Sequence, residues 1–365
     1  MEAAVDSTVE RRDLRDAVRG LIMKTGPGQS PWRRLCDEVG VAGLAIPEQY
    51  GGAAAGLAET CVVMEELGRN LTPSPMLGSA VFAAQALLAC GDGAACERLL
   101  PAVAGGSAVA ALAWTTSAGH WDLAEVAYAA RESGGGGEGN WELDGEAHYV
   151  LDGEAADVLL TVARLPDGGT GLFEVSPRAD GVARAPVTTM DASRDLAVVR
   201  LAGARGRRIG GDAAGPLAFA RDQALIALSA EQVGAAQRAL ELTVVHLLTR
   251  VQFGQLIGGF QALQHRAADL YVLIESARSL SRAVASAADE AASDPDQGLR
   301  AAAAKVYCSQ ALTRAASEMI QLHGAIGITW EHPAHRYLKR AHGSRYLFGT
   351  PARHLAGIAA ILIDR

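Results

Sequence analysis

Three long helical patterns near the C-terminal end of the sequence constrain the fold of this chain most strongly. Residues 219–250, 260–292 and 298–324 each repeat apolar side chains at three- and four-residue intervals, which is the spacing of one face of an α-helix. Long helices of similar length joined by short connections are typical of a four-helix bundle. The sequence therefore predicts a helical bundle over residues 214–365.

The segment before the bundle, residues 109–213, has a different pattern. Short apolar or alternating runs bounded by Gly, Asp and Pro predict β-strands, and they cover residues 109–114, 148–153, 158–165, 170–176 and 196–203. Their spacing predicts a small antiparallel barrel or sandwich. The glycine run at 133–140 is interpreted as a flexible linker. Helical spacing over residues 1–108 completes an α+β chain: an N-terminal all-α domain, a middle β domain and a C-terminal bundle.

The composition excludes several classes of protein. A length of 365 residues suits two or three domains. The net charge of −8 and the lack of a basic stripe argue against nucleic-acid binding. The charged N-terminal stretch lacks the apolar core of a signal peptide, and no run reaches the roughly 18 uninterrupted apolar residues of a membrane span. The five cysteines form no CxxC pair, so reduced thiols and a cytoplasmic location are expected.

Two motifs mark the ends of long helical patterns. The first is Arg250-x-Gln252-Phe253-Gly254, followed by Ile257 and Phe260-Gln261. The second is Gln321-x-His323-Gly324-Ala325-Ile326-Gly327, continuing through Glu331, Pro333 and Arg336. A third lies near the start, where GVAGLAIPEQYGG (40–52) precedes EELGR (65–69). Taken alone, the first motif also fits a plain turn between two helices.

In this order and architecture, the motifs make the chain similar to the acyl-CoA dehydrogenase family from about residue 10 to residue 365. The resemblance implies an FAD held mainly by a neighbouring subunit. Arg250 can pair with a phosphate oxygen through its planar guanidinium, Gln252 can bond the pyrophosphate or ribitol, and Phe253 can pack on the adenosine. The implied contacts are Arg250, Gln252, Phe253, Ile257, Gln261, Gln321, His323, Gly324, Ala325, Gly327 and Thr350.

The half of the site that would hold the chain's own flavin departs from the family pattern. The family's Thr-Glu-Pro strand end corresponds here to Thr115-Thr116-Ser117. His120-Trp121 replaces the small polar turn that follows. Leu151 stands where the resemblance implies a hydroxyl that bonds the flavin near N5.

The catalytic glutamate of the family is also missing. The resemblance implies that this carboxylate removes the α-proton of an acyl-CoA, but Phe348 occupies the usual position. Ala224 occupies the minority position on the first long helix of the bundle, and Asp222 would point elsewhere. Glu231 is the one reserve candidate for the base.

With these selective losses, the chain resembles the non-catalytic subunit of actinobacterial heteromeric acyl-CoA dehydrogenases. That resemblance implies an α2β2 tetramer with a second, catalytic subunit, a bulky acyl-CoA substrate such as a sterol side-chain ester, and reoxidation by an electron-transfer flavoprotein. Two alternatives stay open: a self-sufficient homotetramer that uses Glu231, and a redox-inactive scaffold or binding protein. A metal site at His332-x-x-His335 is not expected, because no further ligand pair completes it.

Overall fold

The computed structural model describes residues 2–25, 30–133, 141–291 and 294–363. All of the predicted linker at 133–140 except Ser133 lies outside the described residues. The chain forms two compact units. Unit 1 combines residues 1–22, 61–72 and 225–365, and unit 2 combines residues 23–60 and 73–224.

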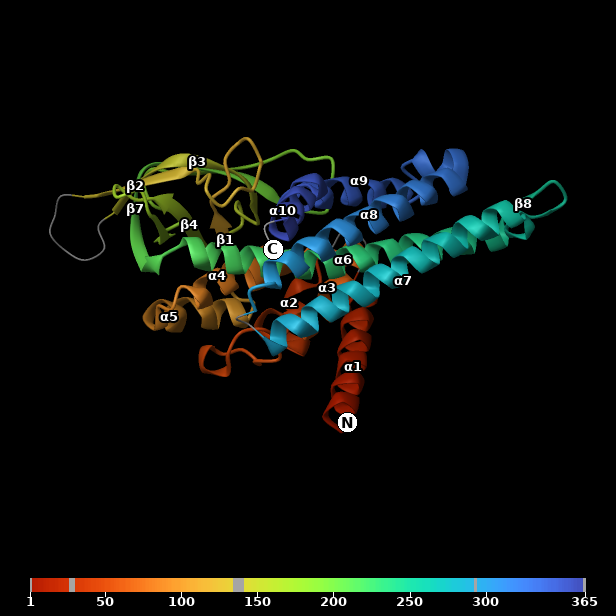
Figure 1. The fold of residues 1–365 in the computed structure, drawn as a ribbon, viewed down its shortest axis with the longest axis horizontal. Helices are drawn as coiled ribbons and strands as arrows, with labels where there is room; N and C mark the ends of the chain where they lie inside the picture. The colour runs from red at the N-terminus through yellow and green to blue at the C-terminus, as the bar shows by residue number, and fades with distance from the viewer. Residues whose placement is uncertain (1, 26–29, 134–140, 292–293, 364–365) are drawn as a thin grey trace. The chain divides into compact units, whose positions relative to one another are not determined.

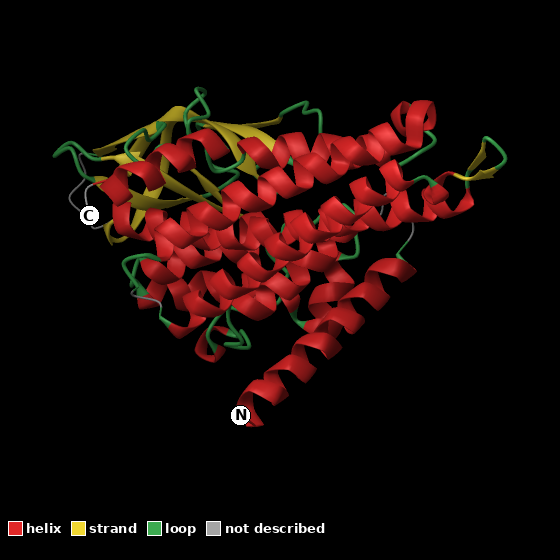
Figure 2. Ribbon diagram, turned by 45° about the vertical axis from the view of Figure 1, so that its right-hand side comes forward, coloured by secondary structure: helices red, strands yellow, loops and turns green. Residues whose placement is uncertain are grey.

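Helices precede and follow a β-rich middle segment along the chain, as predicted (Figure 1); Figure 2 shows the strands in yellow and the helices in red. The helices are α1 (Glu2–Lys24), α2 (Trp32–Val39), α3 (Leu57–Arg69), α4 (Ala84–Ala89), α5 (Gly93–Ala104), α6 (Ala214–Thr249), α7 (Gln261–Glu290), α8 (Gln297–His323), α9 (Ala334–Tyr346) and α10 (Pro351–Ile363). The strands are β1 (Ala110–Ala113), β2 (Tyr128–Glu132), β3 (Trp141–Leu151), β4 (Val158–Arg164), β5 (Thr170–Val175), β6 (Val182–Pro186), β7 (Leu196–Asp212), β8 (Val251–Gln252) and β9 (Gln255–Leu256).

The strands of unit 2 close into a barrel. The hydrogen-bonded order β4-β2-β3-β7-β5 returns to β4, while β1 pairs with the first half of β4 and β6 pairs with β7. Apolar side chains fill the interior because they alternate with polar ones along the strands: Leu143, Leu159, Phe173 and Val199 are fully buried. The prediction of an antiparallel barrel is wrong for two pairs, since β1 and β2 both run parallel to β4.

Helices α6, α7, α8 and α9 carry the C-terminal bundle of unit 1. Within this unit, α3 crosses α6 at a very short distance. A Cβ on Gly68 would lie 2.0 Å from the carbonyl oxygen of Glu231, and a Cβ on Gly234 would lie 1.8 Å from that of Glu65. Only glycine fits at either contact, which explains the glycine of the EELGR motif.

The two glutamates of EELGR have a structural role. Glu66 is fully buried and accepts two hydrogen bonds, of 2.8 and 2.7 Å, from Arg19 of α1. Glu65 pairs with Arg278 of α7. Arg69 reaches Glu241 of α6 through a second bidentate pair. A buried carboxylate needs such partners to remain charged, so this motif ties α1, α3, α6 and α7 together.

An 18-residue window within Ala334–Ile363 has a mean hydropathy of 1.3, so by length and composition alone it is apolar enough to cross a membrane. The structure divides the stretch into α9 and α10 at Phe348, whose φ is 58°, and Gly349, whose φ is 104°.

Candidate functional site

The first helix-end motif forms a hairpin, which we call the Arg250 hairpin (residues 250–257). Helix α6 stops at Thr249, and β8 pairs with β9 around Phe253 (φ 52°) and Gly254 (φ 75°). Two consecutive positive φ values are the signature of a two-residue hairpin turn. The hairpin projects from the ends of α6 and α7 (Figure 1), and Phe253 is 92% exposed.

The second motif forms a turn at the end of α8, which we call the Gln321 turn (residues 321–327). Gly324 has φ 64° and ψ −144°, a conformation that is open only to glycine. A Cβ on Gly327 would lie 3.0 Å from the carbonyl oxygen of Ile320. Gln321, Gly324 and Ala325 are exposed. The glycines therefore fold the turn back on α8 and leave its outer side accessible.

A stack of three imidazoles joins the two motifs. The ring of His246, one helical turn before Arg250, lies 4.4 Å from the ring of His323, two residues after Gln321. His323 in turn lies 4.2 Å from His332. We call these residues the histidine stack. No sequence pattern indicates this stack, because its members lie on three separate segments.

Backbone contacts fix where the protons lie on two of the rings. Nδ1 of His323 is 2.7 Å from the carbonyl oxygen of Met319, and because a carbonyl only accepts, this nitrogen must donate. Nδ1 of His332 accepts from the Ala334 backbone N–H at 3.3 Å. His332 thus caps the N-terminus of α9 as a neutral ring.

The environment keeps the stack uncharged. Burial, then the neighbouring rings of His323 and His332 and the charge of Arg250, lower the pKa of His246. Burial lowers the pKa of His323, and burial and His323 lower that of His332. Close-packed rings in a cationic setting disfavour an added positive charge.

The exposed groups at this end suit an anionic dinucleotide. Arg250 is exposed, and within the described residues no carboxylate lies within ion-pair distance of it. The side-chain amide of Gln252 donates to the carbonyl oxygen of its neighbour Val251, at 2.8 Å. Added Cβ atoms at Gly254 and Gly324 would meet nothing within 4 Å. A guanidinium, exposed amides and accessible backbone are the donor set that a diphosphate needs.

Not all the predicted cofactor contacts gather here. Ile257 is the last residue of the Arg250 hairpin, and Gln261 is the first residue of α7. Thr350 instead caps α10: its hydroxyl accepts from the Arg353 backbone N–H at 3.3 Å. The 13 residues of α9 separate it from the Gln321 turn, a length of about 20 Å.

The positions considered for a catalytic base are buried, except that of Asp222, which is partly buried. Glu231 is 4% exposed, and its carboxylate pairs with Arg340 of α9. Phe348 is 1% exposed. Ala224 is fully buried, and Asp222 bonds Arg221 while burial raises its pKa. The Glu231 carboxylate is therefore held in an ion pair with Arg340.

In unit 2, aromatic rings occupy the region where the family pattern is lost. Trp121 lies 6.0 Å from Trp114 and 6.5 Å from Tyr149, ring centre to ring centre. Trp121 and Tyr149 adopt φ values of 58° and 57°, which are rare and costly for aromatic residues. The Tyr149 hydroxyl reaches the carbonyl oxygen of Ser117 at 3.4 Å, and Leu151 is buried.

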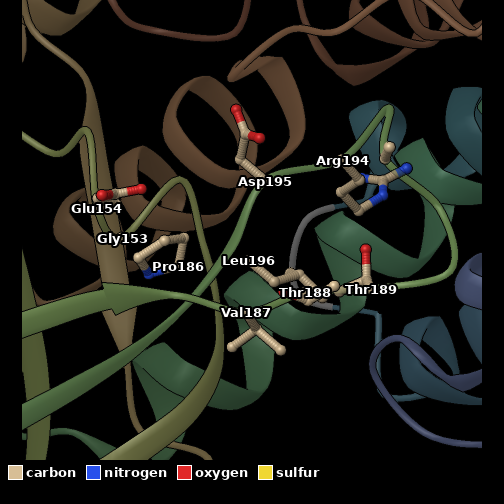
Figure 3. Close-up of a pocket in the computed structure, with 10 residues that line it drawn as sticks. Gly153, Glu154, Pro186, Val187, Thr188, Thr189, Arg194, Asp195 and Leu196 are labelled. Atoms are coloured by element: carbon tan, nitrogen blue, oxygen red, sulfur yellow. The ribbon is translucent and has the colours of Figure 1, made fainter.

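Unit 2 also has a pocket of about 250 Å³ between the turn after β3 and the loop before β7. Glu154, Thr188, Thr189, Arg194 and Asp195 contribute its polar groups (Figure 3). Within the described part of the chain, no group of three His, Cys, Asp or Glu side chains is arranged to hold a metal ion.

Comparison with known proteins places these features in a family. Residues 8–107 match the model of the acyl-CoA dehydrogenase N-terminal domain, and residues 222–363 match that of the C-terminal domain. The acyl-CoA dehydrogenase IpdE2 of Mycobacterium tuberculosis is 39% identical over 94% of each chain.

Two solved complexes are also similar. The steroid ACAD Tcur3481-Tcur3483 has a TM-score of 0.85 and 29% identity, covering 98% of each chain. The ChsE4-ChsE5 complex of Mycobacterium tuberculosis has a TM-score of 0.83 and 26% identity, covering 97% of each chain.

Proposed function

Because the chain belongs to the acyl-CoA dehydrogenase family, we propose that it is the non-catalytic subunit of a heteromeric, FAD-dependent member of that family. The family is one of FAD-binding oxidoreductases. In the proposed α2β2 complex, this chain supplies the diphosphate and adenine contacts of an FAD held mainly by the catalytic subunit. The bound FAD supplies hydride acceptance in the α,β-dehydrogenation of an acyl-CoA to the trans-2-enoyl-CoA.

The observation that carries the proposal is that the Arg250 hairpin and the Gln321 turn keep their donors exposed, while neither the usual glutamate position nor Glu231 offers an accessible carboxylate. Arg250 and Gln321 have exposed side chains. In contrast, Phe348 stands at the usual glutamate position and Glu231 is paired with Arg340. A chain with these features can hold part of a cofactor without carrying out proton abstraction itself.

The relatives support the choice of substrate and partner. One similar solved structure is described as a steroid ACAD formed by Tcur3481 and Tcur3483, and another is the ChsE4-ChsE5 complex. We extend both features to this chain: a bulky, sterol side-chain acyl-CoA as substrate, and a second, catalytic acyl-CoA dehydrogenase subunit as partner. An electron-transfer flavoprotein would reoxidise the complex in the cytoplasm.

The two alternatives are less well supported. A homotetramer that uses Glu231 as its base requires that carboxylate to leave Arg340, and both side chains are buried. A redox-inactive scaffold has no need for the exposed donors of the Arg250 hairpin or for the glycine-only conformation of Gly324.

The decisive experiment is to purify the chain alone and together with a candidate catalytic subunit, and to measure visible spectra and molar masses. We expect a colourless chain alone, and a yellow heterotetramer with one FAD for each pair of chains. A yellow chain with one FAD per chain in a homotetramer would overturn the proposal.

Replacement of Arg250 tests the contribution of this chain within the complex. Arg250→Ala is expected to release FAD from the heterotetramer while leaving its mass unchanged. Arg345→Ala is the matched control, because Arg345 is another exposed arginine of unit 1. Equal FAD retention in both variants would show that the Arg250 hairpin does not contact the cofactor.

A further inference from the structure

We propose that the histidine stack takes up a proton when a diphosphate-bearing ligand binds between the Arg250 hairpin and the Gln321 turn. This inference rests on the proposed function, because it takes those two motifs as the diphosphate contacts. The proton comes from solvent and is held on His246 or on Nε2 of His323. Neither ring needs to touch the ligand.

The position of the stack connects it to both motifs. His246 and Arg250 are one turn apart on α6, where the Arg250 backbone N–H bonds the His246 carbonyl oxygen at 2.9 Å. His323 is the last residue of α8 and immediately precedes Gly324. A ligand that contacts Arg250 and Gln321 therefore brings its negative charge beside these rings.

The hydrogen bonds decide which ring nitrogens can accept a proton. Nδ1 of His323 already donates to Met319, so its Nε2 is the free acceptor. Nδ1 of His332 is occupied by the Ala334 N–H. Protonation of that nitrogen would set two donors against each other at the positive N-terminus of α9. His332 therefore packs against the site without accepting the proton.

Without a ligand, the charges around the stack oppose protonation. Arg250 acts on His246, and Arg336 and Lys339 of α9 act on His335, which in turn acts on His332. On α8, Glu318 is held by Arg266 of α7 and by Arg314. Glu331 is exposed in the turn before α9. A diphosphate supplies the compensating negative charge, and a nearby opposite charge favours the protonated ring.

The consequence is that binding becomes pH dependent. An uptake of up to one proton makes affinity rise by at most about tenfold for each unit by which the pH falls. FAD is a suitable probe because its diphosphate is a diester that keeps its charge across neutral pH. A change in proton count on FAD binding therefore reports the protein.

The test is calorimetry of FAD rebinding to the flavin-stripped heterotetramer, in buffers with different heats of ionisation, between pH 6 and pH 8. We expect net proton uptake, and tighter binding at pH 6 than at pH 8. His246→Gln and His323→Gln should each reduce the uptake. His332→Asn, which keeps a capping acceptor, should retain it, as should the exposed-residue control His265→Gln.

The results separate the two proposals. FAD binding without proton uptake, or uptake that is unchanged in both glutamine variants, would overturn the role of the stack and leave the proposed function intact. If the chain instead binds FAD alone, the same calorimetry on that species tests the stack after the heteromeric proposal has failed. If His323→Gln does not fold, His246→Gln decides the question.

Discussion

Two regions of this chain differ in how they are filled: the region that we propose contacts FAD, and the segment that departs from the flavin-binding pattern expected from the family resemblance. In unit 1, the Arg250 hairpin and the Gln321 turn expose their polar groups. In unit 2, the segment after β1 is packed with the chain's own rings, and Trp114 and Trp121 are 1% and 8% exposed. The first region, which we call the open region, has polar groups available to a ligand. The second, which we call the closed region, is filled by side chains of the chain itself.

The difference has a physical reason. If unit 2 binds no flavin, as we propose, an unfilled slot there would leave a void, and voids in a protein interior cost stability. Trp121 and Tyr149 reduce that cost even though both adopt strained backbone angles. Polar groups at an open surface carry no such cost because water satisfies them. Substitutions in one region can therefore occur without substitutions in the other.

The largest expected effect concerns Glu231. If Glu231 were a catalytic base, the chain would not be a non-catalytic subunit. Removal of one partner of a buried ion pair typically costs about 3–5 kcal/mol. We expect Glu231→Ala to lower the free energy of unfolding by that amount, measured by urea denaturation. The double variant Glu231→Ala, Arg340→Met should lose less than the single one.

Glu290→Ala, on the exposed end of α7, is the matched control and should be nearly neutral. If Glu231→Ala leaves the stability unchanged but abolishes turnover, Glu231 is catalytic. The comparison between an open region and a closed one would then no longer describe a non-catalytic chain.

The second effect compares the two regions directly through FAD retention. Loss of an arginine that pairs with a phosphate costs roughly 2–3 kcal/mol, or on the order of 100-fold in affinity. We expect this loss for Arg250→Ala in the heterotetramer, measured by fluorescence of released flavin. Leu151→Thr restores the hydroxyl expected from the family pattern, and it should leave the FAD ratio unchanged because the surrounding segment remains filled.

A gain of flavin in Leu151→Thr would show that one missing hydroxyl, and not the packed aromatic rings, excludes the cofactor from unit 2.

The third effect is a pH dependence of the free energy of unfolding, caused by Asp152 in unit 2. Asp152 is 9% exposed beside Gly78, and burial raises its pKa to about 7, partly offset by Arg194. Because the native state holds its proton more tightly than the unfolded chain, this residue makes stability fall as the pH rises from about 4 through 7. Asp152→Asn should therefore be more stable than the wild type by about 1–3 kcal/mol at pH 8.

At pH 4 the two proteins should differ little, since Asp152 is protonated in the native state and half protonated in the unfolded one. Denaturation curves at both pH values measure this. A constant difference at all pH values would assign the effect to packing and not to the charge.

The architecture was predictable because it depends on local patterns. Helices α6, α7 and α8 follow the apolar spacing of residues 219–324, and the alternating runs became strands. The glycine motifs marked the ends of α6 and α8. Such signals reside in consecutive residues, and no distant contact overrides them.

What could not be predicted depends on distant residues meeting in the fold. Glu231 and Arg340 are 109 positions apart, and the histidine stack joins three segments. The parallel pairing of β1 with β4 depends on how the barrel closes, which strand patterns do not specify. The family resemblance points to Arg250, Gln321 and His323 as cofactor contacts, but the sequence does not predict that His323 packs between His246 and His332.

The smallest expected effect sets the boundary of the open region. The family resemblance assigns Thr350 to the cofactor, whereas the structure shows its hydroxyl capping α10. Loss of a threonine cap typically costs about 1 kcal/mol, so Thr350→Ala should lower the free energy of unfolding by that amount while FAD retention stays the same. Thr350→Ser keeps the capping oxygen and should be close to wild type in both measurements. If Thr350→Ala releases FAD while its stability is unchanged, the cofactor contacts extend past α9, and the open region is larger than the two motifs joined by the histidine stack.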